Sequence, residues 1–153
     1  MKNVKVVKMF DDVKLPEYAT PGSACFDIYA DFRDALEDHD VVYEHNVVVG
    51  TGLQFEIPEG NVMLVFSRSG QGFKNNVRLA NCVGVIDSDY RGELKVKLTN
   101  DNKGVKGNVQ YFKHGDRIAQ GLILPIEQVS FEVVDELSST VRGEGGFGST
   151  GVN

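Results

Sequence analysis

The chain has 153 residues, with 16 Lys and Arg against 22 Asp and Glu, which gives a formal net charge of −6. This length predicts one domain, or at most two very small ones, with a hydrophobic core that needs neither disulfides nor a structural metal. The acidic balance argues against general nucleic-acid binding and polybasic membrane binding, because both need a broad cationic surface. Residues 31–44 hold six acids and one base, so most of the negative charge lies in this short segment.

Two cysteines, Cys25 and Cys82, indicate free thiols in a reducing compartment. The first residues, MKNVK, lack the apolar run of a signal peptide. No apolar stretch approaches the roughly 20 residues that span a bilayer. We therefore expect a cytoplasmic protein that does not enter a membrane.

The composition predicts an all-β protein, with 22 Val and 17 Gly but only 6 Ala. Valine suits a pleated sheet because its side chain is stiff, and glycine supplies turns and bulges. Gly50 and Gly52 indicate a bulge inside a long strand, and residues 58–61 (PEGN) indicate a turn. Short apolar or alternating runs predict strands, in chain order, over residues 4–10, 24–29, 47–57, 62–66, 94–99, 117–124 and 129–134.

Helices are expected to be few and short. Residues 31–38 could make two turns, and residues 69–74 one turn. Neither is long enough to stand without tertiary support. Short strands with frequent turns and no βαβ rhythm favour a sandwich, a jelly roll or a barrel.

Asp27 is a charged residue inside the otherwise apolar strand 24–29, so it needs a partner or a role. Arg117 opens a later apolar strand, and we expect it to be that partner. The three histidines share no metal-ligand spacing, which makes a zinc site improbable.

The first polar cluster is residues 67–74 (SRSGQGFK), directly after the apolar strand 62–66. A guanidinium, a hydroxyl and free backbone N–H groups at one place suit a phosphate chain. The sequence has no GxxxxGK[ST] motif, so a P-loop is not expected. By spacing alone, an ordinary surface turn explains the cluster equally well.

The second polar cluster is residues 81–93 (NCVGVIDSDYRGE), which predicts a hairpin with acids and an aromatic residue at its tip. Asp87 and Asp89 lie on one face if the segment is extended. Either carboxylate could act as a base or hold a metal-bound water. The alternative is a solvated turn, since Asp and Gly are turn residues in any case.

The last twelve residues contain five glycines and cannot pack a core. A generic glycine-rich tail is simply frayed. This one carries Arg142, Phe147 and Ser149, which could bind phosphate and stack on a base. The alternative is therefore a lid that orders over a ligand.

Five segments, taken together and in order, resemble the motifs of the homotrimeric dUTPases. The third segment carries Asp87 and Tyr90, and the fifth ends near the carboxyl terminus, so the match spans essentially the whole chain. The family more often has Gly where Cys25 stands. The five segments are residues 18–27 (YATPGSACFD), 68–70 (RSG), 84–92 (GVIDSDYRG), 115–120 (GDRIAQ) and 142–151 (RGEGGFGSTG).

The resemblance implies a distorted jelly-roll-like β fold with one short helix, divided into a β domain (residues 1–141) and a mobile arm (residues 142–153). It implies a homotrimer in which the arm closes a neighbour's active site. The implied reaction is hydrolysis of dUTP to dUMP and pyrophosphate with Mg²⁺, which keeps uracil out of DNA and supplies dUMP for dTMP synthesis.

The resemblance also implies roles for single residues. Asp87 would activate the attacking water, and Tyr90 would pack against the deoxyribose. Asp27 would hold hydrated Mg²⁺ through water, while the substrate phosphates bind the ion directly. Uracil would be read by Asn81 and the segment Gly84, Val85 and Ile86, phosphates would be bound by Arg68, Ser69, Gly70 and Gln120, and the arm would contribute Arg142, Phe147, Gly148 and Ser149.

Two alternatives to this function stay open. One is a related dCTP deaminase. The other is a regulatory trimer that binds a protein partner in a nucleotide-dependent way. Residues 31–44 and 101–110 depart from the simplest family pattern and could contact such a partner, although plain surface loops explain them as well.

Overall fold

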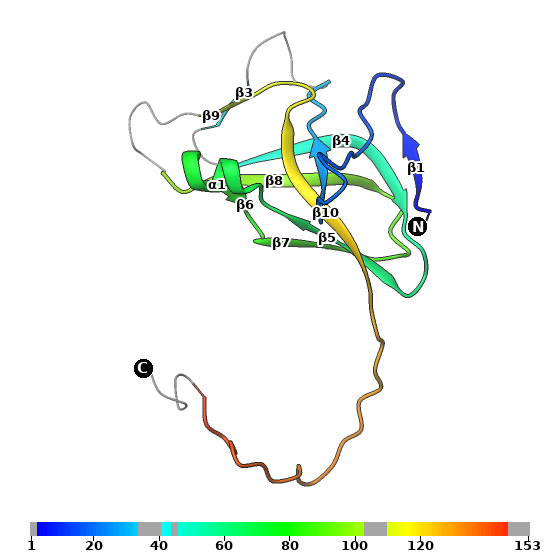
Figure 1. Cartoon of the computed structure of the whole chain (residues 1–153), viewed down its shortest axis with the longest axis vertical. Helices are drawn as coiled ribbons and strands as arrows, with labels where there is room; N and C mark the ends of the chain where they lie inside the picture. The colour runs from blue at the N-terminus through cyan, green and yellow to red at the C-terminus, as the bar shows by residue number, and fades with distance from the viewer. Residues whose placement is uncertain (1–2, 34–40, 44–45, 103–109, 147–153) are drawn as a thin grey trace.

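A computed structural model of the chain describes residues 3–33, 41–43, 46–102 and 110–146. Within them, two four-stranded antiparallel sheets pack against each other, and one short helix lies at one end (Figure 1). This arrangement confirms the predicted all-β, jelly-roll-like fold. No helix in these ranges is long and apolar enough to cross a membrane.

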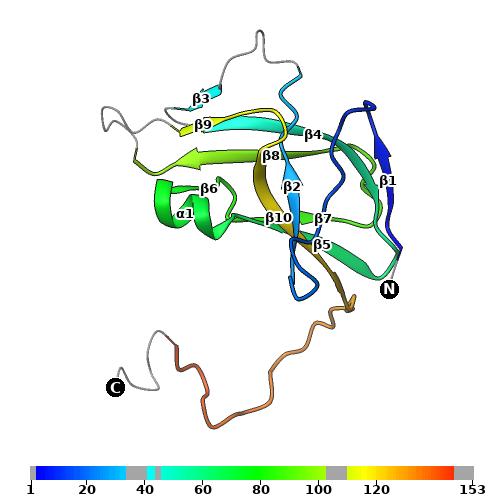
Figure 2. The same cartoon turned by 45° about the horizontal axis from the view of Figure 1, so that its top comes forward.

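The first sheet has the order β1-β4-β8-β6, and the second has the order β2-β10-β5-β7. Strands β3 and β9 form a separate pair, visible at the upper edge of Figure 2. The elements are β1 (Lys5–Lys8), β2 (Phe26–Tyr29), β3 (Val41–Tyr43), β4 (Asn46–Glu56), β5 (Asn61–Phe66), α1 (Ser69–Asn75), β6 (Val77–Leu79), β7 (Val83–Ile86), β8 (Glu93–Asn100), β9 (Gln110–Phe112) and β10 (Arg117–Pro125).

The core lies between the two four-stranded sheets, because both are apolar on their facing sides. Strand β8 alternates as predicted over its first residues, with Leu94 buried and Lys95 exposed. Side chains from both sheets are almost fully inaccessible, among them Ile28, Leu53, Met63, Leu79 and Ile118.

The predicted bulge in β4 is confirmed. Pairing with β8 shifts between Gly50 and Gln54. Gly52 has φ +64°, a conformation that favours glycine, and a Cβ there would lie 2.5 Å from Val13 Cγ2 and 2.7 Å from Asp31 Oδ2. Both the backbone angle and the space therefore require glycine at this point.

One strand prediction is wrong, and another extends too far. Residues 129–134 form no strand, since the chain leaves the second sheet after Pro125 and runs away from the body with Phe131 95% exposed (Figures 1 and 2). The alternation of apolar and polar residues there indicated a half-buried strand, but no strand among the described residues pairs with it. The first strand is shorter than residues 4–10 and ends at Lys8.

The predicted hairpin over residues 81–93 is also wrong in its pairing. Strand β7 pairs with β5, whereas β8 lies between β4 and β6 in the other sheet. Residues 87–92 therefore connect the two sheets. Both edges of β8 are already occupied, so β7 finds its partner in β5.

The predicted turn of helix at residues 69–74 is confirmed as α1, whose C-cap residue Asn76 has φ 54°. Most of the second predicted helix, residues 31–38, lies outside the described residues. Asp31 itself forms a β-bridge with Gly50.

Candidate active site

The first group of candidate site residues, here called the guanidinium cluster, consists of Asp27, Arg68, Ser69, Gly70, Arg117 and Gln120. Strand register brings it together, because Gln120 of β10 lies opposite Phe66 of β5 on one side and Asp27 of β2 on the other. Arg68 Nε donates to Asp27 Oδ1 at 3.0 Å, and Arg117 Nη1 donates to Asp27 Oδ2 at 3.2 Å. The predicted pair of Asp27 and Arg117 is thus confirmed, and Arg68 joins it.

Hydrogen bonds to backbone carbonyls hold the rest of the guanidinium cluster. Gln120 Nε2 donates to the carbonyl oxygen of Ser67 at 2.9 Å. Gln71 Nε2 donates to the carbonyl oxygen of Arg117 at 2.7 Å, and Arg68 Nη1 reaches the same oxygen at 3.3 Å. No role for Gln71 is predicted from the sequence, because nothing in its spacing indicates a contact with β10.

Tyr29 lies beside this cluster, opposite Arg117 in the register. Burial raises the pKa of the Tyr29 hydroxyl, and the charges of Glu17 and Asp27 raise it further. Burial likewise raises the pKa of the Cys25 thiol, with a smaller contribution from Asp27. Both shifts favour the neutral forms, so the charged groups of the cluster are the carboxylate and the guanidiniums.

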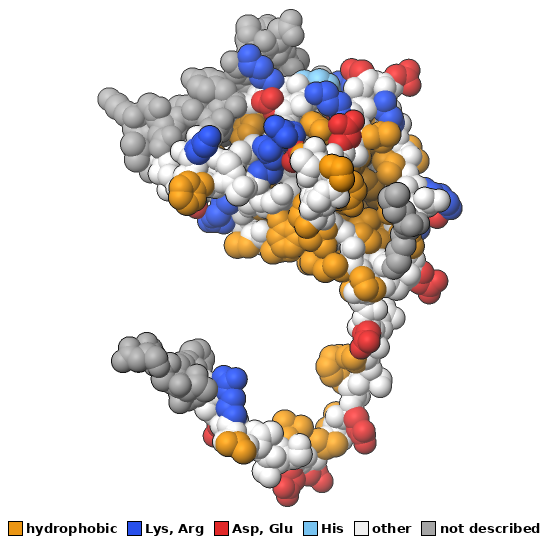
Figure 3. Space-filling view, in the orientation of Figure 1, with side chains coloured by type: hydrophobic (Ala, Val, Ile, Leu, Met, Phe, Trp, Pro, Cys, Tyr) orange, Lys and Arg blue, Asp and Glu red, His pale blue; other side chains and the backbone are white. Residues whose placement is uncertain are grey.

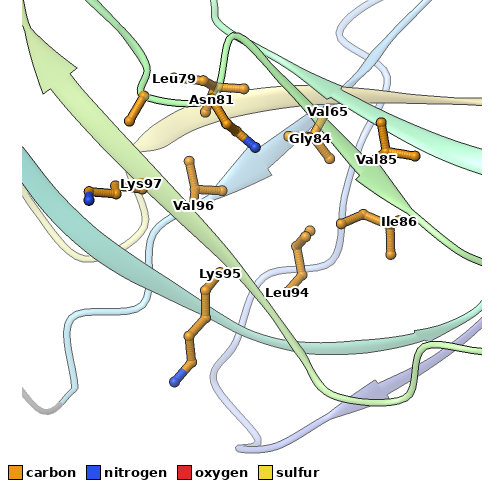
Figure 4. A pocket seen from close by; sticks show the side chains of 11 residues that line it. Val65, Leu79, Asn81, Gly84, Val85, Ile86, Leu94, Lys95, Val96 and Lys97 are labelled. Carbon is orange, nitrogen blue, oxygen red and sulfur yellow. The ribbon is translucent and has the colours of Figure 1, made fainter.

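The second group, here called the pocket cluster, consists of Asn81, Gly84, Val85, Ile86, Asp87 and Tyr90. A hollow of about 450 Å³ lies between β7 and β8, lined by Asn81, Gly84, Val85 and Ile86 among others. Figure 4 shows the Asn81 amide directed among Val65, Gly84 and Val96, while Lys95 and Lys97 point away from it. The lining thus combines apolar side chains with one amide, as is usual for small-molecule pockets.

A second hollow of about 230 Å³ adjoins the first, and Asp87, Tyr90 and Glu93 line it. The two share Val85 and Ile86. Tyr90 is 46% exposed, so its ring is accessible to a ligand. Its hydroxyl donates to the carbonyl oxygen of Glu93 at 3.0 Å.

Gly92 makes room for the Tyr90 ring. A Cβ on Gly92 would lie 2.4 Å from the Tyr90 hydroxyl oxygen and 2.6 Å from its Cζ. Arg91 Nη1 holds the same connection by donating to the carbonyl oxygens of Ser88 at 2.6 Å and Tyr90 at 3.0 Å. The position of the Tyr90 ring therefore depends on glycine at position 92.

Within one subunit, Asp87 lies far from the guanidinium cluster. Strands β5 and β7 are antiparallel, with Ile86 opposite Met63 and Val83 opposite Phe66. Asp87 therefore lies near the start of β5, while Arg68 follows its end. A strand advances about 3.3 Å per residue, so these two places lie roughly 20 Å apart.

The arm residues are only partly described. Arg142 is exposed, and its Nε donates to the carbonyl oxygen of Gly145 at 2.8 Å. Phe147, Gly148 and Ser149 lie outside the described residues. Among the residues that the structure does describe, no three His, Cys, Asp or Glu side chains form a group that could hold a metal ion.

Known proteins resemble this chain over most of its length. The model of the dUTPase family matches residues 11–151. A deoxyuridine 5'-triphosphate nucleotidohydrolase of Helicobacter hepaticus is 42% identical, covering 98% of this chain and 89% of that protein. The protein of the same name from Desulfitobacterium hafniense is 46% identical, covering 92% of this chain and 89% of its own length.

Solved structures agree. A mutant dUTPase of Staphylococcus bacteriophage 80alpha with dUpNHpp superposes with a TM-score of 0.86 at 28% identity, covering 99% of this chain and all of that one. A dUTPase of the S. aureus phage phi11 gives a TM-score of 0.77 at 25% identity over 91% of this chain and all of its own. Fold, motifs and matches thus define the class as an all-β nucleotide hydrolase. The chain belongs to the dUTPase family.

Proposed function

We propose that this chain hydrolyses dUTP to dUMP and pyrophosphate, which keeps uracil out of DNA and supplies dUMP for dTMP synthesis. One observation carries the proposal: in a member of this family, Asp87 and Tyr90 line a hollow that adjoins the Asn81 pocket. A carboxylate, an aromatic ring and an adjoining pocket would serve as the general base, the sugar contact and the base-binding site of a deoxynucleotide hydrolase.

The pocket cluster would bind the nucleoside. Asn81 and the backbone groups of Gly84 and Ile86, at an edge of the second sheet, offer donors and acceptors for a uracil ring. A pocket that encloses the base would reject cytosine by donor and acceptor mismatch and thymine by contact with its methyl group. The Tyr90 ring would lie against the deoxyribose, where a 2′-OH would clash.

The guanidinium cluster would bind the phosphates. Arg68, the start of α1 at Ser69 and Gly70, and Gln120 present cationic and amide donors on one face. Asp27 holds the Arg68 and Arg117 guanidiniums in place before substrate arrives. Such preorganised charge lowers the cost of bringing a carboxylate and a water near a polyanion.

Magnesium fits this donor set only as an ion carried by the substrate. Both oxygens of Asp27 already accept from guanidiniums, yet each has a further lone pair for a water. Asp27 would therefore hold hydrated Mg²⁺ through water. The ion, when bound, neutralises phosphate charge. One phage phi11 dUTPase is described as coordinating a structural Mg(II) ion.

In the chemical step, Asp87 would take a proton from the water that attacks the α-phosphorus. A general base of this kind must be ionised to accept the proton, and Asp87 is exposed beside the second hollow. The attacking water and the α-phosphate would both have to lie next to Asp87. Since the guanidinium cluster of the same subunit is roughly 20 Å away by strand rise, a neighbouring subunit would supply the phosphate contacts.

A homotrimer would bring these parts together. The outer face of the second sheet, defined here by Leu64, Phe66, Leu122, Leu124 and Val85, is apolar, with Val85 60% and Leu124 44% exposed. Figure 3 shows hydrophobic side chains gathered over the lower part of the β body. Residues 126–144 extend away from the β body and are exposed, which supports an arm that contacts a neighbour.

The test is pyrophosphate release across dUTP, dCTP, dTTP, dATP, dGTP and UTP with Mg²⁺. Release from dUTP alone supports the proposal, and ammonia release from dCTP would contradict it in favour of a deaminase. The comparisons favour neither alternative. A regulatory partner at residues 31–44 or 101–110 stays a prediction, because most of both segments lies outside the described residues.

A further inference from the structure

Glu93, the first residue of β8, places its carboxylate inside the bulge of β4. Its Oε1 accepts from the backbone N–H of Thr51 at 3.1 Å and of Gly52 at 2.9 Å. Gly50 leaves the space for this contact, since a Cβ there would lie 2.6 Å from the same oxygen. The side chain is only 18% exposed, and Lys95 Nζ lies 3.4 Å from Oε2. One carboxylate thus satisfies two N–H groups at the register shift.

The backbone of the same residue holds Tyr90. The Tyr90 hydroxyl donates to the carbonyl oxygen of Glu93 at 3.0 Å. The ring lies against Gly92, but nearly half of its surface is exposed. The hydroxyl end of the Tyr90 ring is therefore held by Glu93, and Glu93 is itself held by the backbone of β4.

We propose that Glu93 is a positioning residue for Tyr90 and so sets the preference for 2′-deoxy over ribonucleotides. This inference rests on the proposed function, in which the ring packs against the deoxyribose. A ring excludes a 2′-OH by contact only if it cannot retreat. Anchoring Glu93 in the bulge removes that freedom, because the Tyr90 hydroxyl cannot move without breaking its bond or shifting β8.

The test compares kcat/KM for dUTP with kcat/KM for UTP. We expect Glu93→Ala to lower the dUTP to UTP ratio about tenfold, since small displacements of a positioning group are costly to discrimination. Glu93→Gln keeps an acceptor oxygen at the same reach and should stay within about threefold of wild type. Glu56→Gln is the matched control, because Glu56 is an exposed acid on β4 that pairs with Lys5.

Tyr90→Phe is the second test variant if Glu93→Ala does not fold, because it removes the Tyr90 hydroxyl and leaves the bulge of β4 intact. It should also lower the ratio. The inference is overturned, while the proposed function stands, if the ratio is unchanged in a folded Glu93→Ala or in Tyr90→Phe. An equal loss of kcat/KM for both nucleotides is such an unchanged ratio. A wild-type chain without preference for dUTP overturns the proposed function as well.

Discussion

Arg117 of β10 and Asp27 of β2 form an ion pair across neighbouring strands, with Nη1 and Oδ2 3.2 Å apart. Arg68, which follows β5, binds the other carboxylate oxygen at 3.0 Å. The Asp27 side chain is 13% exposed, so this carboxylate joins three strands of one sheet at a largely buried point. Its removal would leave two guanidiniums without their common acceptor.

Asp27→Ala should therefore destabilise the fold and weaken the response to magnesium. Arg117 is half exposed, so solvent screening limits the loss to about 1–2 kcal/mol. Urea unfolding measures the stability, and turnover against Mg²⁺ concentration measures the metal response. Asp12→Ala is the control, since Asp12 pairs with Arg33 at the surface. Unchanged unfolding and an unchanged Mg²⁺ response would contradict the role of Asp27.

Gly92→Ala should displace the Tyr90 ring, because the new Cβ would lie within 2.4 Å of its hydroxyl oxygen. We expect kcat/KM for dUTP to fall about 10- to 100-fold while the chain stays folded. Gly72→Ala is the control, because a Cβ there meets nothing closer than 3.8 Å. Steady-state kinetics on both variants decide the matter, and full activity in Gly92→Ala would speak against a fixed ring.

Leu124→Glu should disrupt the assembly without unfolding the subunit. The side chain is 44% exposed on the outer face of the second sheet, so a charge there is tolerated in a monomer but not in an apolar interface. Light scattering should give three times 16.8 kDa for wild type and one subunit for the variant. Val7→Glu, an exposed position on β1, should keep the wild-type mass. A wild-type monomer would refute the trimer.

Removal of residues 142–153 should lower turnover and leave the trimer intact, because the arm would add a cation and an aromatic ring to a neighbour's site. Turnover of dUTP and the mass of the assembly are the two measurements. A stop after Pro125 extends the comparison, since residues 126–141 are also exposed. An unaffected turnover after removal of residues 142–153 would show that the arm has no role in catalysis.

Local patterns predicted much of this fold. Short apolar or alternating runs located β4, β5, β8 and β10, and two glycines located the bulge, because these patterns reflect local backbone conformation. Pairing was harder to predict. The sequence indicated a hairpin over residues 81–93, but only the whole fold decides that β7 pairs with β5 and that β8 is already flanked.

The candidate site shows the same division. The charge of Asp27 in an apolar strand was enough to predict its pairing with Arg117. The contacts of Gln71 and Glu93 could not be predicted, because their partners are backbone groups of Arg117, Thr51 and Gly52, which no pattern of side chains indicates. The alternation along residues 129–134 led to a wrong strand prediction, because a strand also needs a partner strand, which a local pattern does not reveal.

The most direct test of the account is the turnover of dUTP by Asp87→Asn beside Asp89→Asn. Asp87 lines the hollow with Tyr90, and spacing alone did not distinguish it from Asp89. We predict that Asp87→Asn binds dUTP nearly as wild type but lowers kcat by about 10²–10⁴-fold, the usual contribution of a general base. Asp89→Asn should change kcat far less. Near-normal turnover in Asp87→Asn would contradict the assignment of Asp87 as the general base.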